Sequence, residues 1–111
     1  MTVGIDLGTC FSAIGRIKSG KIDLIANRMG GRITPSCVAI SRSEFLVGND
    51  AEYAKFDPEY IYIDKSKVFM GTNKVWKTPQ GEITPQYIST KIIKHLIDYA
   101  EYESKEKVES A

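Results

Sequence analysis

The N-terminal third of the chain alternates between apolar and polar or small positions. Val3–Leu7 follows this alternation, and Phe11–Ile17 repeats it after Gly8. A period of two is typical of a strand with one buried face, and glycine lets the chain turn sharply because it has no Cβ. The sequence therefore predicts a hairpin. Lys21–Ala26 continues the alternation and predicts a third strand of a β-meander, followed by a loop over 27–33.

The middle of the chain predicts short elements joined by turns. Two strands are expected, Cys37–Ser41 and Phe45–Val47. A short helix should follow with Asn49 or Asp50 as its N-cap, because short polar side chains accept hydrogen bonds from the first free amides of a helix. It should end at the Asp-Pro pair at 57–58, since the residue before proline is pushed out of the helical region.

The last third predicts a small hairpin and then one long helix. Residues 74–77 and 81–84 flank a Thr-Pro-Gln turn, with Trp76 half-buried against the hairpin. Thr84 is the expected N-cap of the helix and Pro85 its first residue. The apolar stripe has a residue at every fourth position, namely Ile88, Ile92, Leu96 and Ala100.

Composition indicates one soluble domain. The chain has 111 residues, of which 42% are hydrophobic and 26% charged, and a formal net charge of +1. This balance gives no electrostatic reason to expect a nucleic acid or a membrane surface as partner, and no apolar run reaches the roughly 20 residues of a membrane span. Without a secretory signal, Cys10 and Cys37 are expected to be buried free thiols in the cytoplasm. His95 is expected to be a surface or boundary residue.

Candidate chemistry lies in the turn of the first hairpin. Successive amides in such a loop can face one concavity and bind an anion, and Thr9 and Ser12 add hydroxyl donors. Asp6 would repel a phosphate unless a cation lay between them. Mg²⁺ is usually held by one or two carboxylates together with substrate phosphates, so the pattern indicates a loop for a magnesium nucleotide. Taken alone, Asp-x-Gly-Thr is more often an ordinary turn than a functional site.

The opening VGIDLGTCFSAIG resembles that of the seventy-kilodalton heat-shock (DnaK-type) chaperones, which share the actin and sugar-kinase fold. Further similar blocks follow in the same order over nearly the whole chain: Gly30–Ile40, Leu46–Ala51, Asp57–Gly71 and Ile83–Glu101. The resemblance implies an α/β fold (α+β locally), a partial actin-like, ribonuclease H-like ATPase domain. Residues 1–41 would form the phosphate-hairpin sheet, and residues 42–111 a small subdomain with the connecting helix.

The resemblance also implies roles for residues of the hairpin. Asp6 would hold Mg²⁺ through water, and the amides and side chains of Gly8, Thr9, Cys10 and Phe11 would cradle the phosphates of ATP or ADP. Two positions depart from the family. A second threonine is usual where Cys10 stands, and a thiol is a weaker donor than a hydroxyl. Phe11 replaces a more polar residue or a tyrosine, which leaves its backbone amide.

A catalytic lysine is implied in the segment Tyr60–Lys67, whose pattern fits either a strand or a helical turn. Lys67 aligns with the lysine that orients the attacking water and stabilises the transferring phosphoryl group. A shift of register would give this role to Lys65 instead, and a solvated surface lysine is the ordinary alternative. Arg32 matches a position expected to serve lobe packing or contact with an exchange factor.

The implied parent protein is an ATP-hydrolysing chaperone whose partners would be unfolded client peptides, a J-domain co-chaperone and a nucleotide-exchange factor. Val108–Ala111 resembles the entry to a further strand, so the chain is expected to be an N-terminal piece without appreciable ATPase activity of its own. Two alternatives remain: a sugar or acetate kinase of the same fold, and a non-catalytic interaction module. An unprotected edge of the meander predicts marginal stability or self-association.

Overall fold

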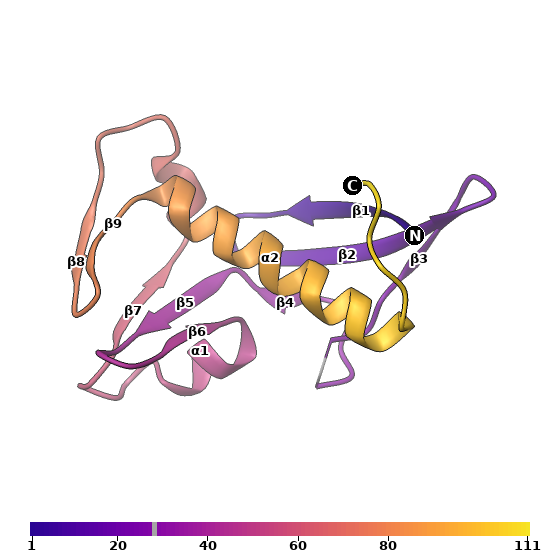
Figure 1. The fold of residues 1–111 in the computed structure, drawn as a ribbon. Coiled ribbons are helices and arrows are strands. Elements are labelled where there is room, and N and C mark those ends of the chain that lie inside the picture. The colour runs from indigo at the N-terminus through magenta and orange to yellow at the C-terminus, as the bar shows by residue number, and fades with distance from the viewer. Residues whose placement is uncertain (28) are drawn as a thin grey trace.

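A computed structural model describes residues 1–27 and 29–111, in a mixed α/β arrangement with one long helix. Figure 1 shows this helix, α2, lying across the chain in front of a β-meander and beside a second, smaller sheet. A separate two-stranded hairpin, β8–β9, lies near the N-terminal end of α2. The sequence predicted a mixed fold with one long C-terminal helix, and the structure confirms it at this level.

The predicted meander is present. β1 (Thr2–Leu7) pairs antiparallel with β2 (Phe11–Lys18), which pairs antiparallel with β3 (Lys21–Leu24). β3 ends two residues earlier than predicted, although Ile25 still donates its amide to the Ile14 carbonyl at 2.9 Å. β4 (Thr34–Pro35) pairs with the start of β2. The sequence did not predict β4, because two residues are too few to show a period.

The second sheet consists of β5 (Cys37–Ile40) between β6 (Phe45–Val47) and β7 (Ile61–Asp64). The two expected strands are confirmed, and the first half of the ambiguous segment 60–67 is a strand. The strand ends at Asp64, and Lys65, with a left-handed φ of 52°, is the N-cap of the 3₁₀ helix η1 (Ser66–Phe69). The segment is therefore a strand and a helical turn in succession.

The predicted short helix is present, but both predicted ends are wrong. α1 covers Asn49–Tyr53, and its N-cap is Gly48 rather than Asn49 or Asp50. Gly48 takes a φ of 72° and donates its amide to the Cys37 carbonyl, while its own carbonyl accepts from Glu52. These two main-chain hydrogen bonds place the N-cap one residue before the first of the two predicted positions. The helix ends at Tyr53, ahead of Pro58, where a tighter bond from Ala54 to Ala51 closes the last turn.

The C-terminal elements follow the sequence prediction. β8 (Trp76–Thr78) and β9 (Gly81–Ile83) form the small hairpin, and Trp76 is half-buried with its ring edge-on to Phe69 at 5.7 Å. α2 covers Pro85–Ser104. The Thr84 hydroxyl accepts a hydrogen bond from the Tyr87 amide at 3.1 Å, which confirms the N-cap.

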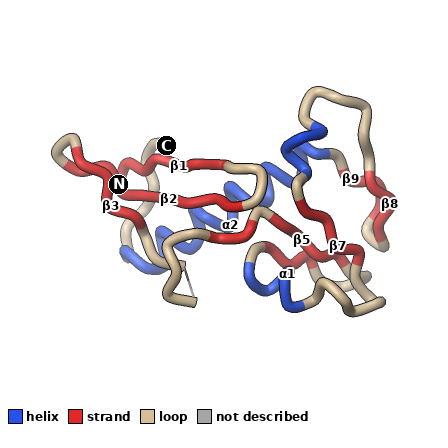
Figure 2. Tube along the Cα trace, turned by 180° about the vertical axis from the view of Figure 1, so that it is seen from behind, coloured by secondary structure: helices blue, strands red, loops and turns tan. Residues whose placement is uncertain are grey.

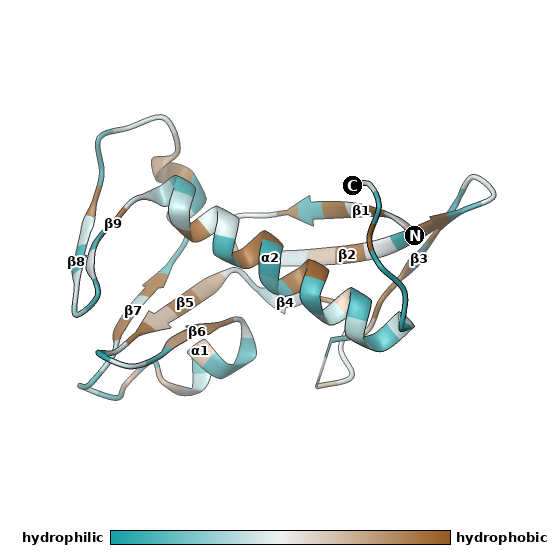
Figure 3. Ribbon diagram, viewed as in Figure 1, coloured by the Kyte–Doolittle hydropathy of each residue, from teal (hydrophilic) through white to brown (hydrophobic). Residues whose placement is uncertain are grey.

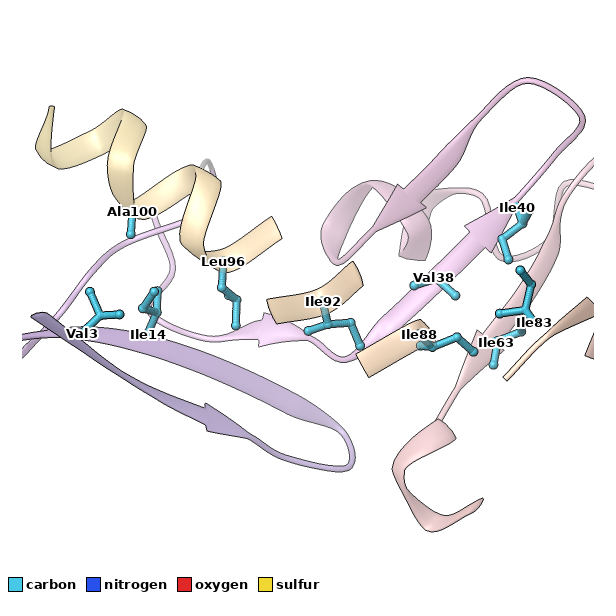
Figure 4. Close-up of a cluster of buried hydrophobic side chains, with 10 residues drawn as sticks. All are labelled: Val3, Ile14, Val38, Ile40, Ile63, Ile83, Ile88, Ile92, Leu96 and Ala100. Atoms are coloured by element: carbon cyan, nitrogen blue, oxygen red, sulfur yellow. The ribbon is translucent and has the colours of Figure 1, made fainter. Parts of the chain in front are cut away.

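The apolar stripe of α2 forms the core together with both sheets. Figure 4 shows Leu96 and Ala100 directed toward Val3 and Ile14 of the meander. At the other end of the stripe, Ile88 lies among apolar side chains of the second sheet and the hairpin: Val38, Ile40, Ile63 and Ile83. Ile92 lies between the two groups. In the hydropathy colouring of Figure 3, α2 carries brown and teal positions on different faces. One helix face thus holds the two sheets together.

The C-terminal segment returns to the meander. Ser110 forms a parallel bridge with Thr2, and the amides of Val3 and Glu109 donate to the carbonyls of Ser110 and Met1 at 2.9 and 2.8 Å. Val108–Ala111 therefore lies along the outer edge of β1, as expected for the entry to a strand. Within residues 1–27 and 29–111, no helix is long and apolar enough to cross a membrane.

Ile92→Ala should lower the free energy of unfolding by about 2–5 kcal/mol, because it removes a fully buried side chain from the junction of the two sheets. Lys94→Ala is the matched control on the exposed face of α2, and its effect should stay within about 0.5 kcal/mol. Urea denaturation followed by circular dichroism measures both. Equal effects of the two substitutions would contradict a core organised on this stripe.

Candidate phosphate-binding site

The turn between β1 and β2 is fixed at both ends by main-chain hydrogen bonds. The Gly8 amide donates to the Phe11 carbonyl at 3.1 Å, and the Cys10 carbonyl accepts from the Ser36 amide at 2.9 Å. A Cβ at Gly8 would lie 2.3 Å from the Phe11 oxygen, which is a severe clash with the backbone. Only glycine fits this position, so Gly8 determines the shape of the loop.

Two amides remain available at the tip of the loop. Within the part of the chain that the structure describes, the amides of Thr9 and Cys10 donate to no acceptor. The Gly8 amide, which was expected to face a phosphate, is instead paired with Phe11. Phe11 is 53% exposed. An anion at the tip would therefore meet two adjacent N–H groups and the Thr9 hydroxyl.

Ser12 does not contribute to the mouth of the loop. Its side chain is buried, and its Oγ shares a hydrogen bond of 2.7 Å with the Oγ of Ser36. The expectation that this hydroxyl would face an anion is wrong, because position 12 alternates to the face of β2 that points into the core. The bond instead fastens the hairpin to the segment between β4 and β5.

Asp6 lies near the end of β1 and is exposed to solvent. It pairs with Ala13 of β2, and alternation along the strand places it on the face opposite Val3 and α2. A shallow hollow of about 250 Å³ on this face is lined by Gly4, Ile5, Asp6, Ala13, Gly15, Ile22 and Leu24. The Asp6 carboxylate thus stands two residues before the loop, at the edge of an open and mostly apolar surface.

Lys67 reaches the same loop from η1. Its Nζ donates a hydrogen bond of 2.6 Å to the carbonyl of Leu7, the last residue of β1. Lys65 occupies the left-handed N-cap position of η1 and makes no hydrogen bond to the loop among the described residues. Of the two lysines that the sequence left open, Lys67 is therefore the one that the fold brings to the hairpin. Nothing in the sequence pattern indicates that the Leu7 carbonyl anchors it.

The arrangement combines two free amides, a lysine ammonium group and one carboxylate around an exposed turn. Such a set can bind a polyanion through the amides and the lysine, and a hydrated divalent cation through the carboxylate. No group of three or more His, Cys, Asp or Glu side chains that could hold a metal ion occurs in residues 1–27 and 29–111. A cation here would need ligands from the anion itself or from water.

The two cysteines differ, and one prediction about them is wrong. Cys37 is buried as expected, and its Sγ donates to the Gly48 carbonyl at 3.4 Å. Burial raises the pKa of the Cys37 thiol. Cys10 is exposed, because it lies at the tip of the turn rather than within a strand.

Two other predicted positions lie away from the loop. Arg32 is exposed and borders a small cavity beneath the loop that follows β3, whose lining also includes Thr34, His95 and Tyr99. His95 is partly buried at the border of the α2 stripe, which confirms the boundary position predicted for it. The cavity reaches the hairpin through Ala13 and Ile14 of β2, but the turn residues 8–10 are not in its lining.

Comparison with known proteins identifies the family. The family model described as Hsp70 protein matches residues 2–105. The chain belongs to the Hsp70 family. A curated relative named chaperone protein DnaK, from Mycoplasmopsis synoviae (strain 53), is 36% identical over 112 residues, and those of Mycoplasma mycoides subsp. mycoides SC and Mesomycoplasma hyopneumoniae (strain 232) are 36% and 37% identical. These alignments cover 98–100% of the chain and 18% of each relative.

The Hsp70 match extends over the hairpin, η1 and the whole of α2, so it includes every residue of the candidate site. The chain spans about 18% of the length of the curated relatives it matches.

Gly8→Ala should disturb the turn, since the added Cβ would meet the Phe11 carbonyl. We expect a loss of stability of about 1–3 kcal/mol and loss of exchange protection at residue 8. Gly4→Ala is the control in the preceding strand β1, because a Cβ there makes only ordinary contact with Ile17 at 3.5 Å. Denaturant titration and amide hydrogen exchange measure both effects. A Gly8→Ala variant as stable and as protected as Gly4→Ala would contradict the geometry of the turn.

Iodoacetamide at neutral pH should modify Cys10 quickly and Cys37 only after unfolding. The thiolate is the reactive form of cysteine. Cys37 is buried, and its raised pKa keeps it in the unreactive thiol form at neutral pH. Because folding raises this pKa, stability should fall as the pH rises above the ordinary range of a thiol. Mass spectrometry of native and denatured samples measures the order of reaction. Modification of a native Cys10→Ser variant at the wild-type rate would contradict it.

Proposed function

We propose that the chain supplies the first phosphate-binding loop for Mg-ATP in the nucleotide-binding domain of an Hsp70 chaperone. In this proposal residues 1–41 and 42–111 are parts of the N-terminal lobe of an actin-like, ribonuclease H-like fold. The observation that carries the proposal is the hydrogen bond from Lys67 to Leu7. It holds a lysine ammonium group on Leu7, which lies between Asp6 and the turn that carries the two free amides, in a chain of this family.

The loop residues take different roles in this proposal. The amides of Thr9 and Cys10 and the Thr9 hydroxyl bind phosphate oxygens. Gly8 and Phe11 give the turn its shape through their main-chain hydrogen bond. Asp6 holds Mg²⁺ through its water ligands, as Mg²⁺ retains several waters when few carboxylates are present. Bound Mg²⁺ would supply charge neutralisation between the carboxylate and the phosphates.

Lys67 acts as the catalytic lysine of the proposal. Its ammonium group is held at the end of β1 by the Leu7 carbonyl, which is a neutral acceptor and leaves the positive charge uncompensated. A lysine in this position attracts phosphate oxygens and favours the charge that develops on a transferring phosphoryl group. The Lys67 side chain is also exposed, so it can exchange the Leu7 carbonyl for a stronger anionic acceptor.

The rest of the proposal concerns the longer protein. The relatives are named as chaperones, and we propose the same for the parent of this chain, with unfolded client peptides, a J-domain co-chaperone and an exchange factor as partners in the cytoplasm. The site on this chain lies open to solvent on one side of a hairpin. We therefore propose that the 111-residue chain binds the nucleotide weakly and does not hydrolyse it appreciably.

Titration of ¹⁵N-labelled chain with Mg-ATP tests the site. The amide signals of Thr9 and Cys10 should shift most, while phosphate release stays at background. Lys67→Met should weaken binding about tenfold or more, because it removes a charge-assisted hydrogen bond, and the matched Lys65→Met should leave affinity within about twofold. Asp6→Asn should reduce the dependence of binding on Mg²⁺.

Shifts concentrated away from the hairpin, or equal effects of the two lysine substitutions, would overturn the site. Phosphate release at a rate typical of a complete chaperone would overturn the proposed inactivity of the chain alone. The folded state of each variant is checked by its circular dichroism spectrum and unfolding midpoint.

A further inference from the structure

β3 is an edge strand whose outer side has no strand beside it in the part of the chain that the structure describes. Arg16 lies opposite Asp23 in the ladder with β2, and Ile25 donates to Ile14 just beyond it. Hydrogen-bonded pairs alternate along an antiparallel ladder, so the main-chain groups of Ile22 and Leu24 point away from β2. These two residues offer free donors and acceptors to another strand.

The side chains along this edge are apolar on one face. Ile22 is 68% exposed and Leu24 is 41% exposed, and both share the sheet face with Ile17. Figure 3 colours much of β3 brown, and Figure 2 shows no helix over the side of the meander that lies opposite α2. An exposed edge beside exposed apolar side chains is a surface on which a further strand gains both hydrogen bonds and burial.

The other edge of the meander is partly occupied. Ser110 and Glu109 already pair with the start of β1, and the Lys67 ammonium group holds the Leu7 carbonyl at its end. The outward main-chain groups of Ile22 and Leu24 have no partner in the part of the chain that the structure describes, and the β3 edge lies across β2 from the end of β1 that Lys67 contacts.

We propose that two copies of this chain associate through their β3 edges, antiparallel and related by a two-fold axis, with Ile22 of one copy opposite Ile22 of the other. In this register Lys21 of each copy lies opposite Asp23 of its partner, which gives two pairs of opposite charge. The two meanders become one continuous sheet. The side chains of Ile17, Ile22 and Leu24 from both copies then form one apolar face.

Charge complementarity selects this register and this partner. A shift that placed Ile22 opposite Leu24 would bring the two Asp23 carboxylates face to face, which is unfavourable. Charged residues on an edge strand ordinarily discourage pairing with other chains. The order Lys21-Ile22-Asp23 is self-complementary in the antiparallel sense, so in this case the charges favour a second copy of the same strand. The proposal does not depend on the phosphate-binding role of the first turn.

Sedimentation velocity over a range of concentrations measures the association. The wild-type chain should dimerise reversibly. Lys21→Asp alone and Asp23→Lys alone should each weaken dimerisation about tenfold or more, because each places like charges at both pairs. The double variant Lys21→Asp/Asp23→Lys restores opposite charges and should recover the wild-type dimer. An equimolar mixture of the two single variants should also dimerise, since each then complements the other.

A second pair of variants separates the main-chain edge from the apolar face. Ile22→Pro removes an outward amide that β2 does not use and should abolish dimerisation, whereas Ile22→Val keeps the amide and should leave it nearly unchanged. Circular dichroism confirms that each variant is folded. A wild-type chain that stays monomeric at millimolar concentration would overturn the proposal. So would single charge variants that dimerise like the wild type, or a mixture of them that stays monomeric.

Discussion

The packing of one face of α2 against two sheets is the constraint on which the other features depend. The meander and the second sheet touch the same stripe at opposite ends, through Leu96 and Ile88. The segment that leaves β7 continues into η1, and Lys67 of η1 bonds to Leu7 at the end of β1. η1 also contacts α2 near Ser89, whose hydroxyl donates to Met70. The packing of η1 against α2 therefore brings Lys67 to Leu7, and no local sequence pattern indicates this contact.

The turn itself is governed by a second constraint, the main-chain pairing of Gly8 with Phe11. This bond removes one amide from the candidate site and leaves those of Thr9 and Cys10 without an acceptor among the described residues. It also explains why glycine is required, since any Cβ would meet the Phe11 carbonyl. The hydrogen-bond donors of the site and the rigidity of the hairpin thus come from the same few atoms. An anion would bind to a loop whose shape is already fixed.

Much of the fold could be predicted from the sequence, because strong local patterns of apolar and polar residues indicate its main strands and its long helix. The alternation over Val3–Leu7 and the stripe of α2 with its Thr84 cap indicate their elements without tertiary information. The ends of α1 could not be predicted, because the Gly48 conformation depends on a long-range bond to Cys37. The inward turn of the Ser12 hydroxyl likewise depends on Ser36, a residue distant in sequence. Local patterns identify elements, whereas the site depends on contacts between them.

A crystal structure of the chain with Mg²⁺ and inorganic triphosphate, at concentrations that saturate binding in solution, tests the central claim most directly. The account predicts a triphosphate oxygen within hydrogen-bond distance of the Thr9 and Cys10 amides. It also predicts that the Lys67 ammonium group contacts the same anion and that hydrated Mg²⁺ lies between the anion and Asp6. A triphosphate bound elsewhere, or a hairpin that stays empty while Lys67 remains on Leu7, would contradict it.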